Sequence, residues 1–216
     1  MSELRDDERR AMVRDQIEAR GVQDPRVLAA MREVPRHLFI PPPYDRDAYR
    51  DSPLPIGNGQ TISQPYIVAV MTGLLRPGPS DNVLEIGTGS GYQAAILSRL
   101  VKTVTSIERI PVVADLARRN LSALHYDNVE VIVGDGTLGY PANAPYDGII
   151  ITAASPEIPQ PLTGQLAEGG RLVIPVGGRD LQELLVLEKH DGELSRQYHG
   201  GVRFVPLIGE HGWTGD

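Results

Sequence analysis

The chain has 216 residues, of which 41% are hydrophobic and 23% are charged, and its formal net charge is −7. This composition is typical of a globular protein with a hydrophobic core, and it excludes a disordered tail or a fibre. The absence of cysteine excludes a disulfide framework, a cysteine nucleophile and a thiolate zinc site. Nucleic acid is not an expected partner, because the arginines of residues 5–20 are balanced by an equal number of acidic residues.

Nothing in the sequence predicts contact with a membrane. The longest nearly apolar stretch, residues 67–75, is far shorter than the roughly 20 residues that a membrane-spanning helix needs. Residues 1–10 are charged and lack the apolar segment of a secretory signal. The five histidines show no metal-ligand spacing. We therefore expect a cytoplasmic monomer that holds no metal ion.

The first part of the chain predicts two helices followed by an irregular segment. Residues 4–20 place apolar side chains at helical spacing, and Gly21 is typical of a helix stop. Asp24 and Pro25 predict the cap and first turn of a second helix. Residues 35–60 are so rich in proline and glycine that no regular element is expected there, and a long irregular segment of this kind usually serves function.

From residue 82 onward, short β-branched runs alternate with helical segments. The expected strands are residues 82–86, 104–107, 129–133, 148–152 and 171–176, and the expected helices are residues 92–100, 111–124 and 162–167. This alternation predicts β-α-β units and a mostly parallel sheet with helices on both faces. Beyond it, strands are expected at 181–188, 193–199 and 203–208, with a hairpin turn at Asp191-Gly192, so the sheet would end in an antiparallel section.

A glycine-rich turn, residues 87–91, follows the strand at 82–86 and opens the next helix. Ligands bind at such positions in open α/β sheets. The dinucleotide fingerprint places its third glycine three residues after the second, whereas these glycines are two residues apart, which disfavours a pyrophosphate. Glu85 stands just before the turn, where its carboxylate would repel a phosphate and attract an ammonium or sulfonium group. The pattern favours S-adenosylmethionine, which carries both cations and no phosphate.

Two more acidic residues follow the next two predicted strands. Glu108 is placed to accept hydrogen bonds from both ribose hydroxyls, and Asp135, within Gly134-Asp135-Gly136, to accept one from the adenine amino group. Each has a structural alternative when taken singly: an exposed ion-pair residue for Glu108, and a plain turn for the Gly134–Gly136 segment. Because three acids at three successive strand ends beside one glycine loop rarely arise by chance, the cofactor interpretation is favoured.

Segments outside the glycine turn carry a more specific pattern. They are Gly59-Gln60-Thr61-Ile62-Ser63-Gln64-Pro65, Ala144-Pro145-Tyr146-Asp147, Leu166–Gly177 and Val202-Arg203-Phe204-Val205-Pro206-Leu207. With them, the chain resembles the protein-L-isoaspartate (D-aspartate) O-methyltransferases. The resemblance implies an α/β fold of the Rossmann-like class I methyltransferase type: a mostly parallel, doubly wound sheet with antiparallel C-terminal strands and an N-terminal helical extension. The chain would form one domain, residues 1–216. Its parts would be the N-terminal helices with the active-site loop (1–78), the core that binds S-adenosylmethionine (79–180) and the C-terminal strands (181–216).

The same resemblance implies roles for particular residues. Ser63 corresponds to the active-site serine; Gly87, Gly89, Glu108, Asp135 and Gly136 correspond to cofactor contacts; and Ile62, Ser63, Val205 and Pro206 to the surface that receives the substrate. The implied reaction moves the methyl group of S-adenosylmethionine to the free α-carboxylate of an L-isoaspartyl residue in a damaged protein or peptide and releases S-adenosyl-L-homocysteine. The methyl ester then collapses to a succinimide, which begins repair.

The residues alone leave alternatives open. Ser63 precedes a helical pattern and is also suited to be its N-cap. The glycine turn and its acids would equally serve another S-adenosylmethionine-dependent methyltransferase that acts on a small molecule or RNA. A binding module that holds the nucleoside without turnover and a nicotinamide dehydrogenase are two further alternatives.

Overall fold

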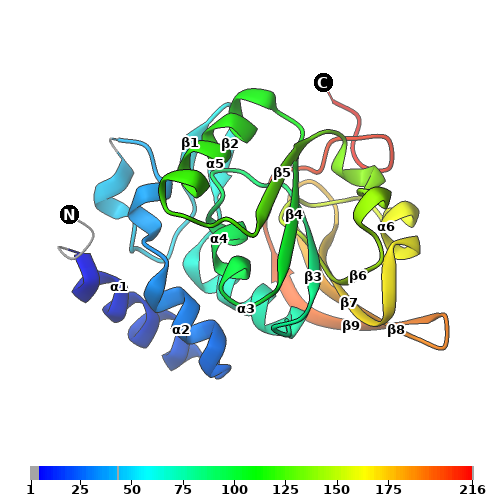
Figure 1. Ribbon diagram of the computed structural model, residues 1–216, viewed down its shortest axis with the longest axis horizontal. Coiled ribbons are helices and arrows are strands. Elements are labelled where there is room, and N and C mark those ends of the chain that lie inside the picture. Colours follow the sequence, from blue (N-terminus) through cyan, green and yellow to red (C-terminus); the bar gives the residue numbers. More distant parts are fainter. Residues whose placement is uncertain (1–4, 43, 216) are drawn as a thin grey trace.

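The computed structural model describes residues 5–42 and 44–215, and a seven-stranded sheet forms its centre (Figure 1). The strands are β3 (Asn82–Ile86), β4 (Thr103–Glu108), β5 (Val129–Val133), β6 (Tyr146–Ile151), β7 (Leu166–Gly177), β8 (Gln182–His190) and β9 (Glu193–Val202). Their order across the sheet is β5-β4-β3-β6-β7-β8-β9. Strands β3 to β7 pair in parallel, whereas β8 and β9 are antiparallel, which confirms the predicted arrangement.

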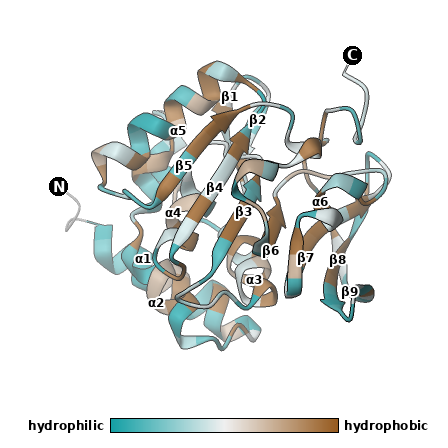
Figure 2. Cartoon of the chain, turned by 45° about the vertical axis from the view of Figure 1, so that its right-hand side comes forward, coloured by the Kyte–Doolittle hydropathy of each residue, from teal (hydrophilic) through white to brown (hydrophobic). Residues whose placement is uncertain are grey.

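Alternating side chains of the strands point into two hydrophobic cores, one on each face of the sheet. Val83 and Val104 belong to the first core, which the helices α1 (Asp6–Met12), α2 (Pro25–Glu33), α3 (Pro65–Leu75), α4 (Tyr92–Ser98) and α5 (Pro111–Ala123) cover. Leu84 and Ile107 belong to the second, which α6 (Gln160–Gly164) and the C-terminal segment cover. Figure 2 shows the resulting concentration of hydrophobic residues along β5 and β7. The central strands β3, β4 and β6 are therefore buried on both faces, as strands of parallel sheets usually are, whereas the edge strand β9 is mostly exposed.

The helix expected over residues 4–20 is less regular than predicted. After α1, the chain continues as a π-helical turn (Val13–Ile17) and a 3-10 turn (Glu18–Arg20). Gly21 then takes a left-handed conformation, with φ of 94°, and ends the helical segment as predicted. Leu4, which the prediction included, lies outside the described residues.

A short hairpin interrupts the segment in which no regular element was expected, so that part of the prediction was wrong. Strands β1 (Leu54–Gly57) and β2 (Gln60–Ile62) pair antiparallel. Asn58 and Gly59 join them with positive φ angles of 52° and 70°, the conformation that two-residue hairpin turns require. The Asn-Gly pair was the signal in the sequence for this turn. The hairpin places Ser63 between the end of β2 and the start of α3.

The strand expected at residues 203–208 does not form. Instead this segment crosses the carboxyl end of β6, where Ala154 N donates to Val205 O at 2.8 Å and Leu207 N donates to Ala154 O at 2.7 Å. These bonds make an isolated bridge between Ala154 and Pro206. One bridge fixes the segment beside the sheet but does not make it a strand.

Two further observations concern the described residues. No helix in this part of the chain is long and apolar enough to cross a membrane. Within residues 5–42 and 44–215, no three histidine or acidic side chains gather in a way that could hold a metal ion.

Candidate active site

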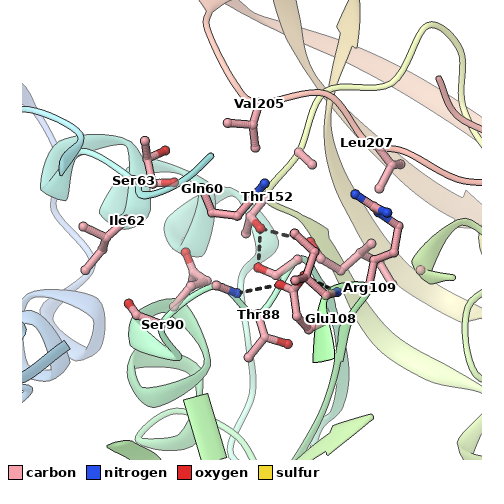
Figure 3. Close-up of a pocket in the computed structure, with 18 of the residues that line it drawn as sticks. Gln60, Ile62, Ser63, Thr88, Ser90, Glu108, Arg109, Thr152, Val205 and Leu207 are labelled. Carbon is pink, nitrogen blue, oxygen red and sulfur yellow. Dashed lines mark hydrogen bonds between the residues drawn. The ribbon is translucent and has the colours of Figure 1, made fainter. Parts of the chain in front are cut away.

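A cavity of about 230 Å³ opens at the carboxyl ends of β3, β4 and β6 (Figure 3). The chain winds from β3 outward to β4 and β5 on one side and to β6 and β7 on the other. Such a reversal of strand order leaves a crevice where ligands bind in open α/β sheets. Residues 59–63 of the N-terminal hairpin and residues 205–208 of the C-terminal segment also line the cavity, so it is walled from three directions.

The glycine loop brings its backbone directly to the cavity. Gly87 has a φ of 93°, and a Cβ atom on it would lie 2.5 Å from the hydroxyl oxygen of Thr152. That hydroxyl donates to Gly87 O at 2.6 Å, while Gly87 N donates to Ile107 O at 2.8 Å. Gly136 is equally constrained, because its Cβ would lie 2.4 Å from the Cγ2 atom of Ile86. Glycine at these positions lets three strand ends approach one another and leaves room for a ligand.

Glu108 lies at the end of β4 and lines the cavity. One carboxylate oxygen accepts a hydrogen bond from Gly89 N at 3.0 Å, and the other accepts one from Ile110 N at 3.0 Å. Each oxygen has a second lone pair and can accept another hydrogen bond. The two backbone donors thus hold a carboxylate that can accept from both hydroxyls of a ribose.

Glu85 does not line the cavity, and the prediction that it contacts the cofactor is contradicted. Its side chain is 0% exposed, and one carboxyl oxygen accepts a hydrogen bond from the Ser106 hydroxyl. The other oxygen has no hydrogen-bond partner among the residues that the structure describes. Burial raises the pKa of Glu85 to about 8, so at neutral pH this side chain is mostly uncharged. An uncharged, enclosed carboxyl group does not attract a sulfonium ion.

The buried carboxyl group of Glu85 is linked to the glycine loop through Ser106. The Ser106 hydroxyl that bonds Glu85 also lies 2.6 Å from the hydroxyl of Thr88, and Thr88 lines the cavity. The chain Glu85–Ser106–Thr88 therefore links the interior of the sheet to the loop.

Asp135 also lies beside the cavity rather than in its lining. One carboxylate oxygen accepts from Thr137 N at 2.9 Å and from the Thr137 hydroxyl at 2.7 Å, and the other accepts from Glu210 N at 2.8 Å. Burial by itself would raise the pKa of Asp135, but these hydrogen bonds outweigh it and lower the pKa. Asp135 fixes the C-terminal segment to the end of β5, and contact with an adenine amino group stays a prediction.

Ser63 stands where the cavity meets a second, more open groove. The groove has a volume of about 770 Å³ and shares Thr61, Ser63, Thr152 and Val205 with the cavity. Ser63 is not the helix cap considered above, because α3 begins at Pro65 and Gln64 precedes it. In the part of the chain that the structure describes, the Ser63 hydroxyl has no hydrogen-bond partner. It is therefore free to bond a ligand at the junction.

A network that the sequence did not reveal holds this junction in place. Asp51 accepts hydrogen bonds from the Gln64 side chain at 2.6 Å and from Tyr66 N at 3.3 Å, and forms an ion pair with Arg20 at 2.6 Å. The Arg20 guanidinium in turn lies 3.4 Å from the centre of the Tyr66 ring. The network flanks Ser63 on its C-terminal side. Its members are far apart in the sequence, so no local pattern could have indicated it.

The structure thus brings most of the predicted site residues together. Those that line the cavity are Ile62, Ser63, Gly87, Gly89, Glu108, Gly136, Val205 and Pro206. Sequence reasoning missed Thr152, whose place directly after β6, at the edge that bears the glycine loop, was the available signal.

Comparison with known proteins identifies the family. A family model described as protein-L-isoaspartate(D-aspartate) O-methyltransferase (PCMT) matches residues 7–212. The chain belongs to this family. A relative from Methanoregula boonei, named protein-L-isoaspartate O-methyltransferase, is 69% identical over 97% of this chain and 96% of its own length.

Solved structures of the family share the fold. One named protein-L-isoaspartate O-methyltransferase is similar with a TM-score of 0.85 and 32% identity, over 94% of this chain and 67% of that one. Another, from Plasmodium falciparum, is described as a putative enzyme of the same kind in complex with S-adenosyl-L-homocysteine. Its TM-score is 0.80 at 24% identity, over 93% of this chain and 98% of that one. The predicted Rossmann-like methyltransferase fold is confirmed.

Proposed function

We propose that this chain transfers the methyl group of S-adenosylmethionine to the free α-carboxylate of L-isoaspartyl residues in damaged proteins and peptides. The supporting observation is the junction at Ser63, where the cavity that Glu108 lines meets a more open groove of about 770 Å³. Membership of the PCMT family supports the same reaction. We propose Gly87, Gly89, Glu108 and Gly136 as the cofactor contacts, and Ile62, Ser63, Val205 and Pro206 as the substrate contacts.

S-adenosylmethionine supplies a methyl group on a positively charged sulfur atom and leaves as S-adenosyl-L-homocysteine. The protein needs no general base, because a carboxylate with a pKa of about 3.5 is already ionised at neutral pH. Its task is to place one carboxylate oxygen in line with the methyl carbon, and such positioning can contribute on the order of 7–11 kcal/mol.

Ser63 is the group suited to this positioning. Its free hydroxyl can donate to one oxygen of the substrate carboxylate and leave the other oxygen to attack the methyl group. The nearest backbone donor in the first turn of α3, Tyr66 N, already bonds Asp51, and Pro65 has no N–H. The following backbone nitrogen then attacks the carbonyl carbon of the product ester and methanol leaves, and water can open the resulting succinimide to normal aspartate.

A pair of peptides that differ only in an aspartyl or isoaspartyl linkage tests the proposal. With cofactor labelled in the methyl group, we expect label in the isoaspartyl peptide alone. Equal labelling of both peptides, or of neither, would contradict it. Binding of S-adenosyl-L-homocysteine without methyl release would instead support a binding module, and binding of NADH in its place would support a dehydrogenase.

We further propose that residues 1–216 act as one domain and that the protein works as a cytoplasmic monomer on isoaspartyl proteins and peptides, without nucleic acid or membrane. Support for one domain comes from the cavity, because residues 59–63 and 205–208 complete it from opposite ends of the chain. Sedimentation of the purified protein and fractionation of cells test the remaining points. A stable dimer, or recovery with membranes, would contradict them.

A further inference from the structure

The groove beyond Ser63 differs in charge from the rest of the protein. Its lining includes three arginines, Arg20, Arg179 and Arg203, and a single acidic residue, Asp180. The chain as a whole carries a net charge of −7. A local excess of positive charge on an acidic protein attracts negatively charged groups to that place.

The three arginines are not equivalent. Arg20 is paired with Asp51 and stacked on Tyr66, so its charge is largely neutralised within the protein. Arg179 lies over the Trp213 ring, 5.0 Å from its centre, and has a further interaction. Arg203 is exposed, and its side chain has no hydrogen-bond or ion-pair partner among residues 5–42 and 44–215.

The backbone that carries Arg203 is nevertheless well fixed. The next residue, Phe204, donates its N–H to the buried side chain of Gln182 at 3.0 Å. One residue further on, Val205 O accepts from Ala154 N at 2.8 Å, and Val205 lines both the cavity and the groove. Arg203 thus presents an uncompensated guanidinium at a defined place on the wall that leads to Ser63.

We propose that Arg203 is a specificity-determining residue that favours isoaspartyl substrates with an acidic side chain next to the isoaspartyl residue. The inference rests on the proposed function, since it assigns the groove to the peptide on either side of the methylated carboxylate. The attraction acts in solvent, where a single exposed ion pair changes an equilibrium by about two- to fivefold. It weakens with salt, because the screening length falls from about 30 Å at 0.01 M to about 10 Å at 0.1 M ionic strength.

Short isoaspartyl peptides that differ at one neighbouring position test this assignment. Glutamate, glutamine or lysine is placed before the isoaspartyl residue in one series and after it in another, and kcat/KM is measured for each. In at least one series we expect glutamate to exceed glutamine and glutamine to exceed lysine, with about two- to fivefold at each step in low salt. The contrast should shrink at about 300 mM salt.

Charge reversal at Arg203 distinguishes the effect of this residue on peptide preference from the effect of the protein's net charge. In Arg203→Glu the order of the peptides should invert, and in Arg203→Gln it should flatten. Arg196→Glu is the matched control: Arg196 is exposed on β9, does not line the groove, and gives the same change in net charge. This control should keep the wild-type order.

Each result decides a different question. Methylation of all the peptides with no charge preference, or an unchanged order in Arg203→Glu, overturns the assignment of Arg203 and leaves the proposed function standing. Inversion in Arg196→Glu as well would assign the preference to net charge and also overturn it. Failure of the wild-type protein to methylate any isoaspartyl peptide would reject the proposed function itself.

Discussion

The cavity and the groove that meet at Ser63 are built differently. In the cavity, the glycine loop and Glu108 stand at the ends of strands of the main sheet, and backbone N–H groups hold the Glu108 carboxylate. Of the four residues that the cavity shares with the groove, Thr61, Ser63 and Val205 come from segments outside that sheet, and Thr152 directly follows β6. Side-chain bonds across long sequence distances, such as Asp51 to Gln64 and Asp135 to Glu210, hold the segments next to residues 59–63 and 205–208.

This difference indicates a division of labour within the site. Strand ends are fixed by many backbone hydrogen bonds, so they suit a constant ligand such as a cofactor. Loop walls that are joined to the sheet by only a few hydrogen bonds, such as those between Ala154 and residues 205 and 207, can vary without disturbing the sheet, so they suit the recognition of varied substrates. Changes on one side should therefore leave the other side's binding largely intact.

The largest effect is expected at Glu108. Glu108→Ala removes the acceptors for Gly89 N and Ile110 N, and with them the acceptors that we propose for the ribose hydroxyls. Hydrogen bonds to charged groups contribute about 1.5–3 kcal/mol each, so loss of two should weaken binding of S-adenosyl-L-homocysteine by at least about 100-fold. Calorimetric titration measures this. Glu193→Ala, at the exposed start of β9, is the control and should bind as the wild type does.

The next effect concerns stability and arises from Glu85. Its pKa is about 8 in the folded protein, against an ordinary value of 4.5. Between these two values the unfolded chain releases a proton that the folded protein keeps, so the free energy of unfolding falls as pH rises. Below pH 4.5 both states are protonated, and the full contribution is present.

Glu85→Gln removes this titration. The free energy of unfolding of the variant, minus that of the wild type, should therefore be larger at about pH 8.5 than at about pH 5, by on the order of 2–4 kcal/mol. Urea unfolding at both pH values measures the gain. Glu183→Gln, exposed on β8, should show a constant difference from the wild type. The same constant difference in Glu85→Gln would mean that Glu85 is ionised at neutral pH.

The smallest of the three effects is expected at Ser63. Ser63→Ala removes the hydrogen bond that we propose to the substrate carboxylate and should lower kcat/KM for an isoaspartyl peptide about ten- to a hundredfold. Binding of S-adenosyl-L-homocysteine should not change, because Ser63 stands at the junction with the groove. Ser80→Ala is the control, because Ser80 is exposed and lines neither the cavity nor the groove. If Ser63→Ala weakened cofactor binding as strongly as it lowered activity, the separation of the two regions would not hold.

The strands and the glycine loop at the cofactor cavity were predicted well from the sequence, because the sequence patterns that indicate them are local. The bounds of β3 and β5 match the predicted ones, and the glycine loop follows β3 as expected. Runs of β-branched residues and a glycine-rich turn need no distant partner to be recognised. The roles predicted for Ser63, Val205 and Pro206, in contrast, came from the family resemblance.

The error at Glu85 shows what a position in the sequence leaves undetermined. Glu85 was placed by its distance from the glycine loop, although side chains alternate along a strand. It shares a face of β3 with Val83, which packs in the core beneath the helices. That alternation was available in the sequence, and it places the carboxyl group in the core rather than in the cavity. The strand that was expected at 203–208 but does not form has another cause, since the position of this segment depends on its hydrogen bonds with Ala154 after the sheet has formed.

The position of residues 205–208 in the chain also bears on biosynthesis. These are the last of the cavity's lining residues to be synthesised, and they are held by the turn that follows them. In that turn a Cβ atom on Gly209 would lie 2.1 Å from the Asp135 carboxylate. A chain still growing on the ribosome can form the glycine loop and the strand ends but lacks this wall. The methyl-donor pocket is therefore completed only after residues 205–208 have been synthesised, and binding of the cofactor can stabilise only a chain that has reached that stage.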